Sequence, residues 1–173
     1  MEHSHEKLSI LLSPFTFAAT LIIAAPSVSA HSDEHVKKHE GTPLSTLEHS
    51  FGRQGKPKQV SRTIILDMND SMRFTPSEIK VKQGETIKFI VRNKGRVRHE
   101  MVLGSLDDLK AHGEMMKNHP DMAHSDPYMA HVKPGGEEDM VWQFTKAGAF
   151  NFGCLAPGHF EAGMIGKIIV TKG

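Results

Sequence analysis

Apolar and polar residues alternate along several short stretches of this chain, which is the pattern of β-strands that bury one face. Within residues 85–93, Ile87, Phe89 and Val91 fall on one face, with charged residues on the other. Comparable strand-like runs, bounded by turn residues, lie at residues 61–68, 78–82, 97–103, 138–145, 149–153 and 165–171. About seven short strands separated by frequent turns predict an all-β fold, a β-sandwich with Greek-key connections over residues 60–173.

The strand pattern is interrupted between about residues 105 and 136. Ser105, followed by Asp107 and Asp108, resembles a helix start with an N-cap and acidic residues in the first turn. That helix is expected to end near Pro120, and the remainder to be irregular. The segment is rich in imidazole and thioether side chains, namely His112, Met115, Met116, His119, Met122, His124, Met129 and His131. We therefore predict a Met/His-rich insertion in the strand framework.

The first 30 residues have the composition of an export signal. Residues 8–25 form an uncharged apolar run after a lysine, and the small residues 28–30 suit a signal peptidase. A membrane-spanning anchor is the alternative, but the run is short for a bilayer, is interrupted by Pro14 and is followed directly by Pro26. We predict a signal peptide over residues 1–30, a periplasmic protein, and no stable membrane span after cleavage.

Residues 31–59 are polar, contain glycines and prolines, and offer few large apolar side chains. This composition predicts a disordered, flexible tail without a core of its own. His31, His35 and His39 recur every four residues, which would place them on one face of a helix, and His49 follows. We predict that the tail captures metal, and the alternative is a solvated segment whose histidines bind nothing specific.

The overall charge and the use of sulfur-containing residues narrow the function. A net charge of +1 with interspersed signs gives no reason to expect a nucleic-acid or anionic-membrane partner. Twelve His and ten Met accompany a single Cys, and both abundant types can bind copper. A lone Cys in an exported protein cannot form an internal disulfide, so it is either a buried inert thiol or a metal ligand.

Cys154, His159 and Met164 follow one another at five-residue intervals, in a loop with glycines and a proline ahead of the last strand. Thiolate, imidazole and thioether together select copper, and two His with one Cys and a weak axial Met are typical of electron-transfer copper sites. His99 is the natural fourth donor, because the other histidines outside the loop lie in the first 30 residues, the tail or the insertion, and not in the strand framework. A lone Cys is more often a buried apolar residue, but four matched donors favour a mononuclear copper centre.

Residues 93–104 and 150–170 resemble the cupredoxins, the blue-copper family of plastocyanin, azurin and rusticyanin, and the likeness covers residues 60–173. The resemblance implies His99, Cys154, His159 and Met164 as the copper ligands, with a ligand spacing similar to that of rusticyanin. Phe152 stands where the family commonly has an aromatic residue. Glu100 departs from the family, which often has Asn after the first His to bridge the two ligand loops.

Three functions follow from these features. The first is a copper-binding protein of periplasmic copper tolerance, resembling cupredoxins of the CopI kind, in which the tail and insertion donors are auxiliary copper sites. Its partners would be copper ions and a copper-exporting or copper-oxidising periplasmic protein or a redox protein. The second is a soluble one-electron carrier in a respiratory chain. An enzyme is disfavoured, because one sandwich cannot supply a second catalytic copper centre, and the many extra soft donors favour copper tolerance.

Overall fold

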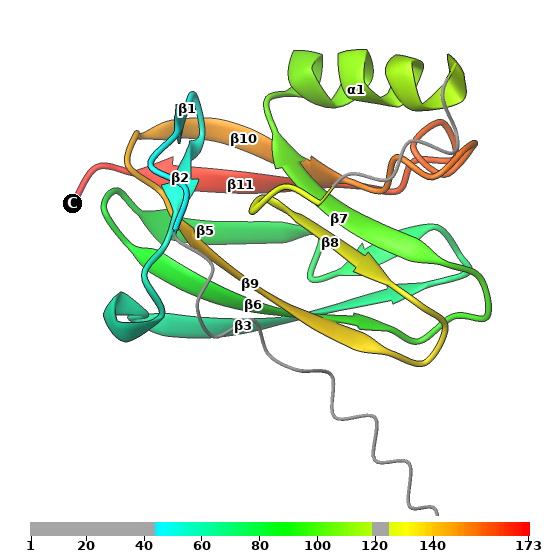
Figure 1. Cartoon of the computed structure of the whole chain (residues 1–173), viewed down its shortest axis with the longest axis horizontal. Coiled ribbons are helices and arrows are strands. Elements are labelled where there is room, and N and C mark those ends of the chain that lie inside the picture. The colour runs from blue at the N-terminus through cyan, green and yellow to red at the C-terminus, as the bar shows by residue number, and fades with distance from the viewer. Residues whose placement is uncertain (1–43, 119–124) are drawn as a thin grey trace, which may run out of the picture. The chain divides into compact units, whose positions relative to one another are not determined.

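The computed structural model describes residues 44–118 and 125–173, which form two packed β-sheets with one α-helix (Figure 1). The first sheet has the order β1 (Glu48–His49), β2 (Gly52–Gln54), β9 (Glu137–Gln143), β6 (Thr86–Asn93), β3 (Arg62–Asn69) and β4 (Arg73–Thr75). The second has the order β5 (Glu78–Lys82), β11 (Ile165–Thr171), β10 (Gly148–Gly153), β7 (His99–Gly104) and β8 (Met129–Val132). Successive strands repeatedly change sheet, so the predicted β-sandwich is confirmed.

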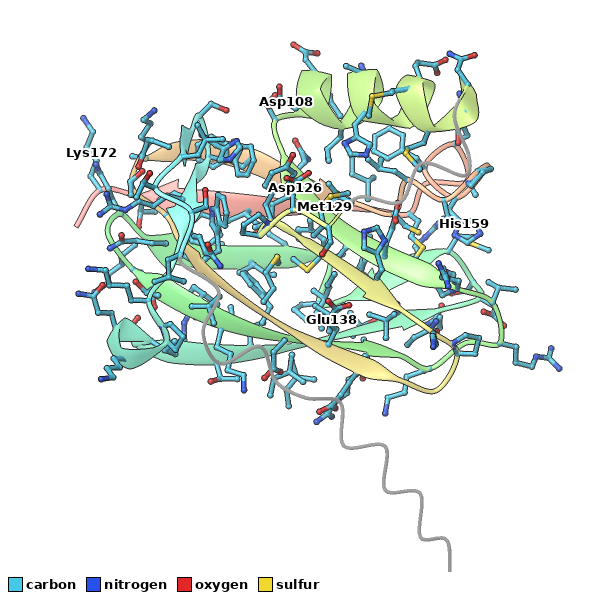
Figure 2. All side chains as sticks on the ribbon, in the orientation of Figure 1. Asp108, Asp126, Met129, Glu138, His159 and Lys172 are labelled. Atoms are coloured by element: carbon cyan, nitrogen blue, oxygen red, sulfur yellow. The ribbon has the colours of Figure 1, made fainter. Side chains whose placement is uncertain are left out.

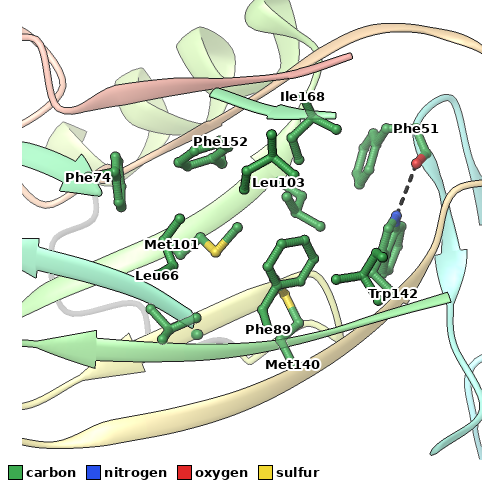
Figure 3. Packing of buried hydrophobic residues seen from close by; sticks show 14 of the residues in the cluster. Phe51, Leu66, Phe74, Phe89, Met101, Leu103, Met140, Trp142, Phe152 and Ile168 are labelled. Atoms are coloured by element: carbon green, nitrogen blue, oxygen red, sulfur yellow. Dashed lines mark hydrogen bonds between the residues drawn. The ribbon is translucent and has the colours of Figure 1, made fainter. Parts of the chain in front are cut away.

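The core between the sheets follows from the alternation in the sequence. Ile87, Phe89 and Val91 of β6 are fully buried, and the partner strand β9 contributes Met140 and Trp142. Figure 3 shows Phe89, Met140 and Trp142 facing side chains of the second sheet, among them Leu103, Phe152 and Ile168. Burying one such side chain contributes about 1.5–3 kcal/mol. The core therefore supplies a rigid support for the loops at the ends of the strands.

The domain begins earlier than residue 60, so the prediction of a flexible tail is wrong for residues 44–59. β2 pairs with β9, and Phe51 is buried with its ring stacked on Trp142 at a centroid distance of 5.3 Å. The Trp142 indole N–H donates to the carbonyl of Phe51 at 3.0 Å. A 3₁₀ helix at Pro57–Gln59 then leads into β3. The predicted signal peptide and residues 31–43 lie outside the described residues.

The insertion has more regular structure than its sequence predicted. The helix α1 (Leu106–Asn118) is confirmed, and the Ser105 hydroxyl accepts from the Asp108 backbone N–H at 3.1 Å as an N-cap. The strand β8, which was expected to be irregular, pairs antiparallel with β7. Neither helix among the described residues is long and apolar enough to cross a membrane. Leu109 and Met129 attach the insertion to the second sheet by packing against Val102 and Leu155.

Candidate metal centre

Three of the four predicted ligands meet at one end of the second sheet. His99 begins β7, Cys154 directly follows β10, and these strands are paired with Gly153 opposite Val102. Nδ1 of His159 lies 3.2 Å from Nδ1 of His99 and 3.2 Å from Sγ of Cys154, and Sγ lies 4.0 Å from Nδ1 of His99. Among the described residues, this is the one group with three His, Cys, Asp or Glu donor atoms within 4.8 Å of one another.

The spacing of the three donors fits one small metal ion. Ligands about 2.0–2.3 Å from an ion such as Zn²⁺ would lie roughly 3.5 Å apart in a trigonal plane, close to the separations above. His99 and Cys154 are fully buried, and burial raises the pKa of the Cys154 thiol to about 12. A bound cation deprotonates such a thiol. Burial also lowers the pKa of His159, and the proximity of His99 lowers it further, which favours the neutral imidazole that coordinates metals.

The ligand loop is held in shape by its own backbone. The Cys154 N–H donates to the carbonyl of Met164 at 3.1 Å, and the Met164 N–H donates to the carbonyl of His159 at 3.0 Å. Gly158 and Gly163 have φ values of 82° and 89°, which favour glycine. Met164 itself is fully buried. These contacts place the fourth predicted ligand in the same loop turn as the other two, with its backbone bonded to both.

Asp70 supports the centre and was not predicted from the sequence. Its Oδ1 lies 3.2 Å from Nε2 of His99, the ring nitrogen that faces away from Cys154. The Arg96 and Val97 backbone N–H groups donate to the same carboxylate, and the Arg96 bond is the main cause that lowers the Asp70 pKa. Carboxylates in this position orient a ligand imidazole and set its tautomer. A Cβ at Gly95 would lie 2.0 Å from Oδ1 of Asp70, so only glycine leaves room.

Glu100 bridges the two ligand loops, although the family often has Asn at this position. Its backbone N–H donates to Sγ of Cys154 at 3.4 Å, and its Oε1 accepts from the Leu155 N–H at 2.9 Å. Its Oε2 lies 2.8 Å from Nδ1 of His131 in the neighbouring strand β8. The carboxylate thus joins the strand of the first ligand to the ligand loop, and adds a contact to the insertion.

The auxiliary donors are placed in several different environments. Met129 is buried against Leu109, and the His49 ring packs 4.9 Å from that of Tyr128. His131 pairs with Glu100. On α1, Met115 is exposed while His112 and Met116 are half-buried. The remaining predicted donors lie outside the described residues: His31, His35, His39, His119, Met122 and His124.

The fold and the three donors agree with a known family. The profile described as "Copper binding proteins, plastocyanin/azurin family" matches residues 61–171. The chain belongs to this family of cupredoxins, and the matched residues include all four predicted ligands. Copper is therefore the metal that this family binds and the cofactor of this chain.

Within the family, the chain is similar to proteins named copper-resistant cuproprotein CopI. The one from Rubrivivax gelatinosus is 42% identical over 160 residues, covering 92% of this chain and 97% of the relative. The one from Pseudomonas aeruginosa is 33% identical over 156 residues, covering 70% and 82%. The predicted likeness to cupredoxins of the CopI kind is confirmed.

A solved structure shows the same fold at lower sequence identity. Reduced auracyanin from the photosynthetic bacterium Roseiflexus castenholzii aligns with a TM-score of 0.56 at 22% identity. The alignment covers 65% of this chain and 98% of auracyanin. This likeness supports the sandwich architecture and adds nothing about partners.

Proposed function

We propose that His99, Cys154 and His159 hold one copper ion in a type 1-like centre, with Met164 as its weak axial ligand. The observation that carries the proposal is the separation of 3.2–4.0 Å between the three donor atoms, two of which belong to fully buried residues. When bound, the copper supplies one-electron Cu(II)/Cu(I) chemistry. The protein would supply the Cys154 sulfur, the imidazole nitrogens of His99 and His159, and the Asp70 and Glu100 contacts that orient these ligands.

The wider role that we propose is copper tolerance in the periplasm, with export directed by residues 1–30. Relatives at up to 42% identity carry the name copper-resistant cuproprotein, and the chain has twelve His and ten Met. Donors outside the centre would bind further copper and feed or buffer it, imidazole suiting Cu(II) and thioether Cu(I). The partners would be copper ions and a copper-exporting, copper-oxidising or redox protein. We propose a copper-handling protein rather than an enzyme.

A soluble one-electron carrier is the second candidate. The ligands stand on paired strands and a hydrogen-bonded loop, so the geometry is fixed before copper binds. His99 and Cys154 are fully buried and His159 is half-buried. An electron could therefore pass through the partly exposed His159 ring with little rearrangement, as a carrier requires.

Substitution of the thiol tests the centre. Cys154→Ser is expected to abolish the sulfur-to-Cu(II) visible absorption, because the serine oxygen cannot supply the thiolate ligand. Met164→Leu should retain the absorption with a shifted reduction potential, because an axial thioether tunes the site without forming its plane. Visible and electron paramagnetic resonance spectra of both copper-loaded variants measure this. An unchanged visible spectrum in Cys154→Ser would remove the proposed centre.

Copper stoichiometry and survival distinguish tolerance from electron transfer. We expect more than one copper per wild-type chain from His31 onward, and one copper when the tail and insertion donors are replaced. A deletion strain should be sensitive to excess copper and rescued by the wild-type gene, with Cys154→Ser as the matched control. If the wild type binds a single copper, and deletion slows a respiratory electron transfer without changing copper survival, the carrier function is correct.

A further inference from the structure

The helix α1 packs against the ligand loop, residues 154–164, which carries three of the four predicted copper ligands. Figure 1 shows the helix on the outer side of the second sheet, with its last turn close to this loop. In Figure 2, His159 lies at the end of the molecule that this turn faces, whereas Asp108 marks the first turn of the helix. The helix carries none of the four ligands, so any influence on the copper centre passes through the residues that it contacts.

An apolar contact holds the first half of the helix to the loop. Leu109 is the buried residue of α1, and it clusters with Leu155, which directly follows Cys154. Phe160, which directly follows His159, packs against the same cluster. The apolar cluster around one helix residue therefore includes the chain neighbours of two copper ligands.

The helix and the loop approach each other closely. A Cβ at Gly153, the last residue of β10, would lie 3.0 Å from the Phe160 ring and 3.6 Å from Cδ1 of Leu109. A cavity of about 50 Å³ between the two segments is lined by Gly113 of the helix and by residues 155–158 of the loop. The contact thus extends along the part of the loop that precedes His159.

An ion pair joins the last turn of the helix to the part of the loop that follows His159. Nζ of Lys117 lies 2.6 Å from Oε1 of Glu161 and 2.7 Å from Oε1 of Glu114, which is on the helix itself. The Lys117 and Glu161 side chains are partly exposed, so the pair contributes little to overall stability. Its effect is to fix where the end of the helix stands relative to the loop.

Hydrogen bonds within the loop make the segment around His159 a unit. The His159 N–H donates to the carbonyl of Ala156 at 3.0 Å, and the Ala162 N–H donates to the carbonyl of Gly158 at 3.1 Å. Because these bonds lie inside the segment, its position depends on contacts with other elements. Arg73 of β4 supplies one, donating from Nη1 to the carbonyl of Ala162 at 2.9 Å, and α1 supplies those described above.

We propose that Leu109 and Lys117 are positioning residues for His159, and that through them the helix slows the release of copper from the centre. Copper leaves only after a ligand detaches, and His159 is the one predicted ligand that is not fully buried. Contacts that hold the residues on both sides of His159 oppose the movement that would detach its ring. They add no donor atom, so they change the rate of copper exchange and not the colour of the centre. The assignment rests on the proposed copper centre.

The ion pair is tested by copper transfer from the loaded chain that begins at His31 to excess EDTA, followed as decay of the sulfur-to-Cu(II) absorption. Lys117→Gln and Glu161→Gln should each speed the transfer about two- to fivefold, the range expected for a partly exposed ion pair. Reversal of both charges together, Lys117→Glu with Glu161→Lys, should restore the wild-type rate. Glu114→Gln is the matched control and should leave the rate unchanged, because it removes the bond within the helix and keeps the bond to Glu161.

The apolar contact is tested at Leu109. Leu109→Ala should speed the transfer at least tenfold, since it removes a buried side chain, whereas Leu109→Met keeps the volume and should stay within about twofold of the wild type. Hydrogen exchange of the copper-free chain shows whether the loop itself opens more readily. The amides of His159 and Ala162 should exchange at least tenfold faster in Leu109→Ala. A contact that stabilised only the domain as a whole would speed exchange in β6 and leave these two amides unchanged.

Two results would overturn the positioning role. One is a wild-type transfer rate in both Leu109→Ala and Glu161→Gln, and the other is unchanged exchange of the His159 and Ala162 amides in Leu109→Ala. If circular dichroism shows that Leu109→Ala does not fold, Lys117→Gln and Glu161→Gln decide alone against the Glu114→Gln control. Absence of sulfur-to-Cu(II) absorption in the wild type would refute the copper centre itself, whereas normal absorption with unchanged transfer rates refutes only the role of the helix.

Discussion

At the scale of single residues, Glu100 shows how one side chain joins three elements around the copper centre. It contacts Cys154 through its backbone, Leu155 through one carboxylate oxygen and His131 through the other. A neutral amide could make the bond to Leu155, but it would bring no charge. A carboxylate beside the copper ligand therefore stabilises the more positive Cu(II) state electrostatically.

Glu100→Gln separates the charge from the bridge. The amide oxygen can still accept from Leu155, so the visible spectrum should persist. Loss of the negative charge should raise the reduction potential by on the order of 50–100 mV, since one charge a few ångströms away is worth about 1–3 kcal/mol in a medium of intermediate dielectric constant. Protein-film voltammetry measures the shift.

Glu100→Ala removes the bridge as well and should change the spectrum and speed copper loss. Glu137→Gln, which breaks an exposed ion pair with Arg92, is the control and should leave the potential unchanged. A potential in Glu100→Gln equal to that of the wild type would show that the carboxylate does not act on the copper electrostatically.

At the scale of secondary-structure elements, the long strands were predictable and the short ones were not. The alternation over β6 and the apolar run of β11 gave nearly their observed bounds. β1 and β2 have two and three residues, which are too few for a hydrophobic period to appear. Their position depends instead on the packing of Phe51 against Trp142. β8 is similarly short and depends on pairing with β7.

The same limit applies to the copper centre. The ligand loop is local in sequence, and its three donor types at regular spacing were sufficient to predict it. Asp70 lies 29 residues before His99, in a segment that reads only as a turn. The Glu100–His131 contact likewise depends on the strand pairing. Contacts between distant segments carry no local signal, so the residues that support the ligands emerge only from the fold.

Two glycine substitutions should have opposite effects on stability. A Cβ at Gly166 in β11 would lie 2.0 Å from Cζ of Phe152, so Gly166→Ala should lower the free energy of unfolding by about 1–3 kcal/mol or more. A Cβ at Gly113 in α1 would lie 3.9 Å from Leu155, an ordinary contact. Gly113→Ala should therefore raise the unfolding free energy by roughly 0.5–1 kcal/mol through helix propensity.

Urea unfolding of the copper-free proteins, followed by circular dichroism, measures both changes. Because Phe152 precedes Cys154 by two residues, Gly166→Ala should also weaken copper binding, whereas Gly113→Ala should not. Wild-type stability in Gly166→Ala would mean that the Phe152 ring can move aside without cost, contrary to the close packing of the core.

At the scale of the whole molecule, the structure places the start of the domain earlier than the sequence pattern predicted. A chain that begins at Val60, the predicted start, lacks Phe51 and leaves Trp142 without its stacking partner and hydrogen-bond acceptor. A chain that begins at residue 44 keeps both. We expect the shorter chain to lose several kcal/mol of stability, as for loss of a buried aromatic side chain.

Trp142 is the single tryptophan, and it reports on this boundary directly. Its emission should be blue-shifted in the chain from residue 44 because the indole is buried, and red-shifted in the chain from Val60. Thermal unfolding by fluorescence measures both properties. Equal emission and equal unfolding temperatures would place the boundary at residue 60 after all.

The position of β11 also has a consequence for the order of events in folding. The last strand of the chain lies inside its sheet, between β5 and β10, and its pairing with β5 joins residues almost ninety positions apart, as for Ile168 and Ile79. Contacts of such long sequence separation form late. The ligand loop is suspended between β10 and β11, so it closes only after the C-terminal residues have arrived. A chain in which β11 has not yet paired with β5 and β10 therefore cannot close the ligand loop, and copper binding has to follow that pairing.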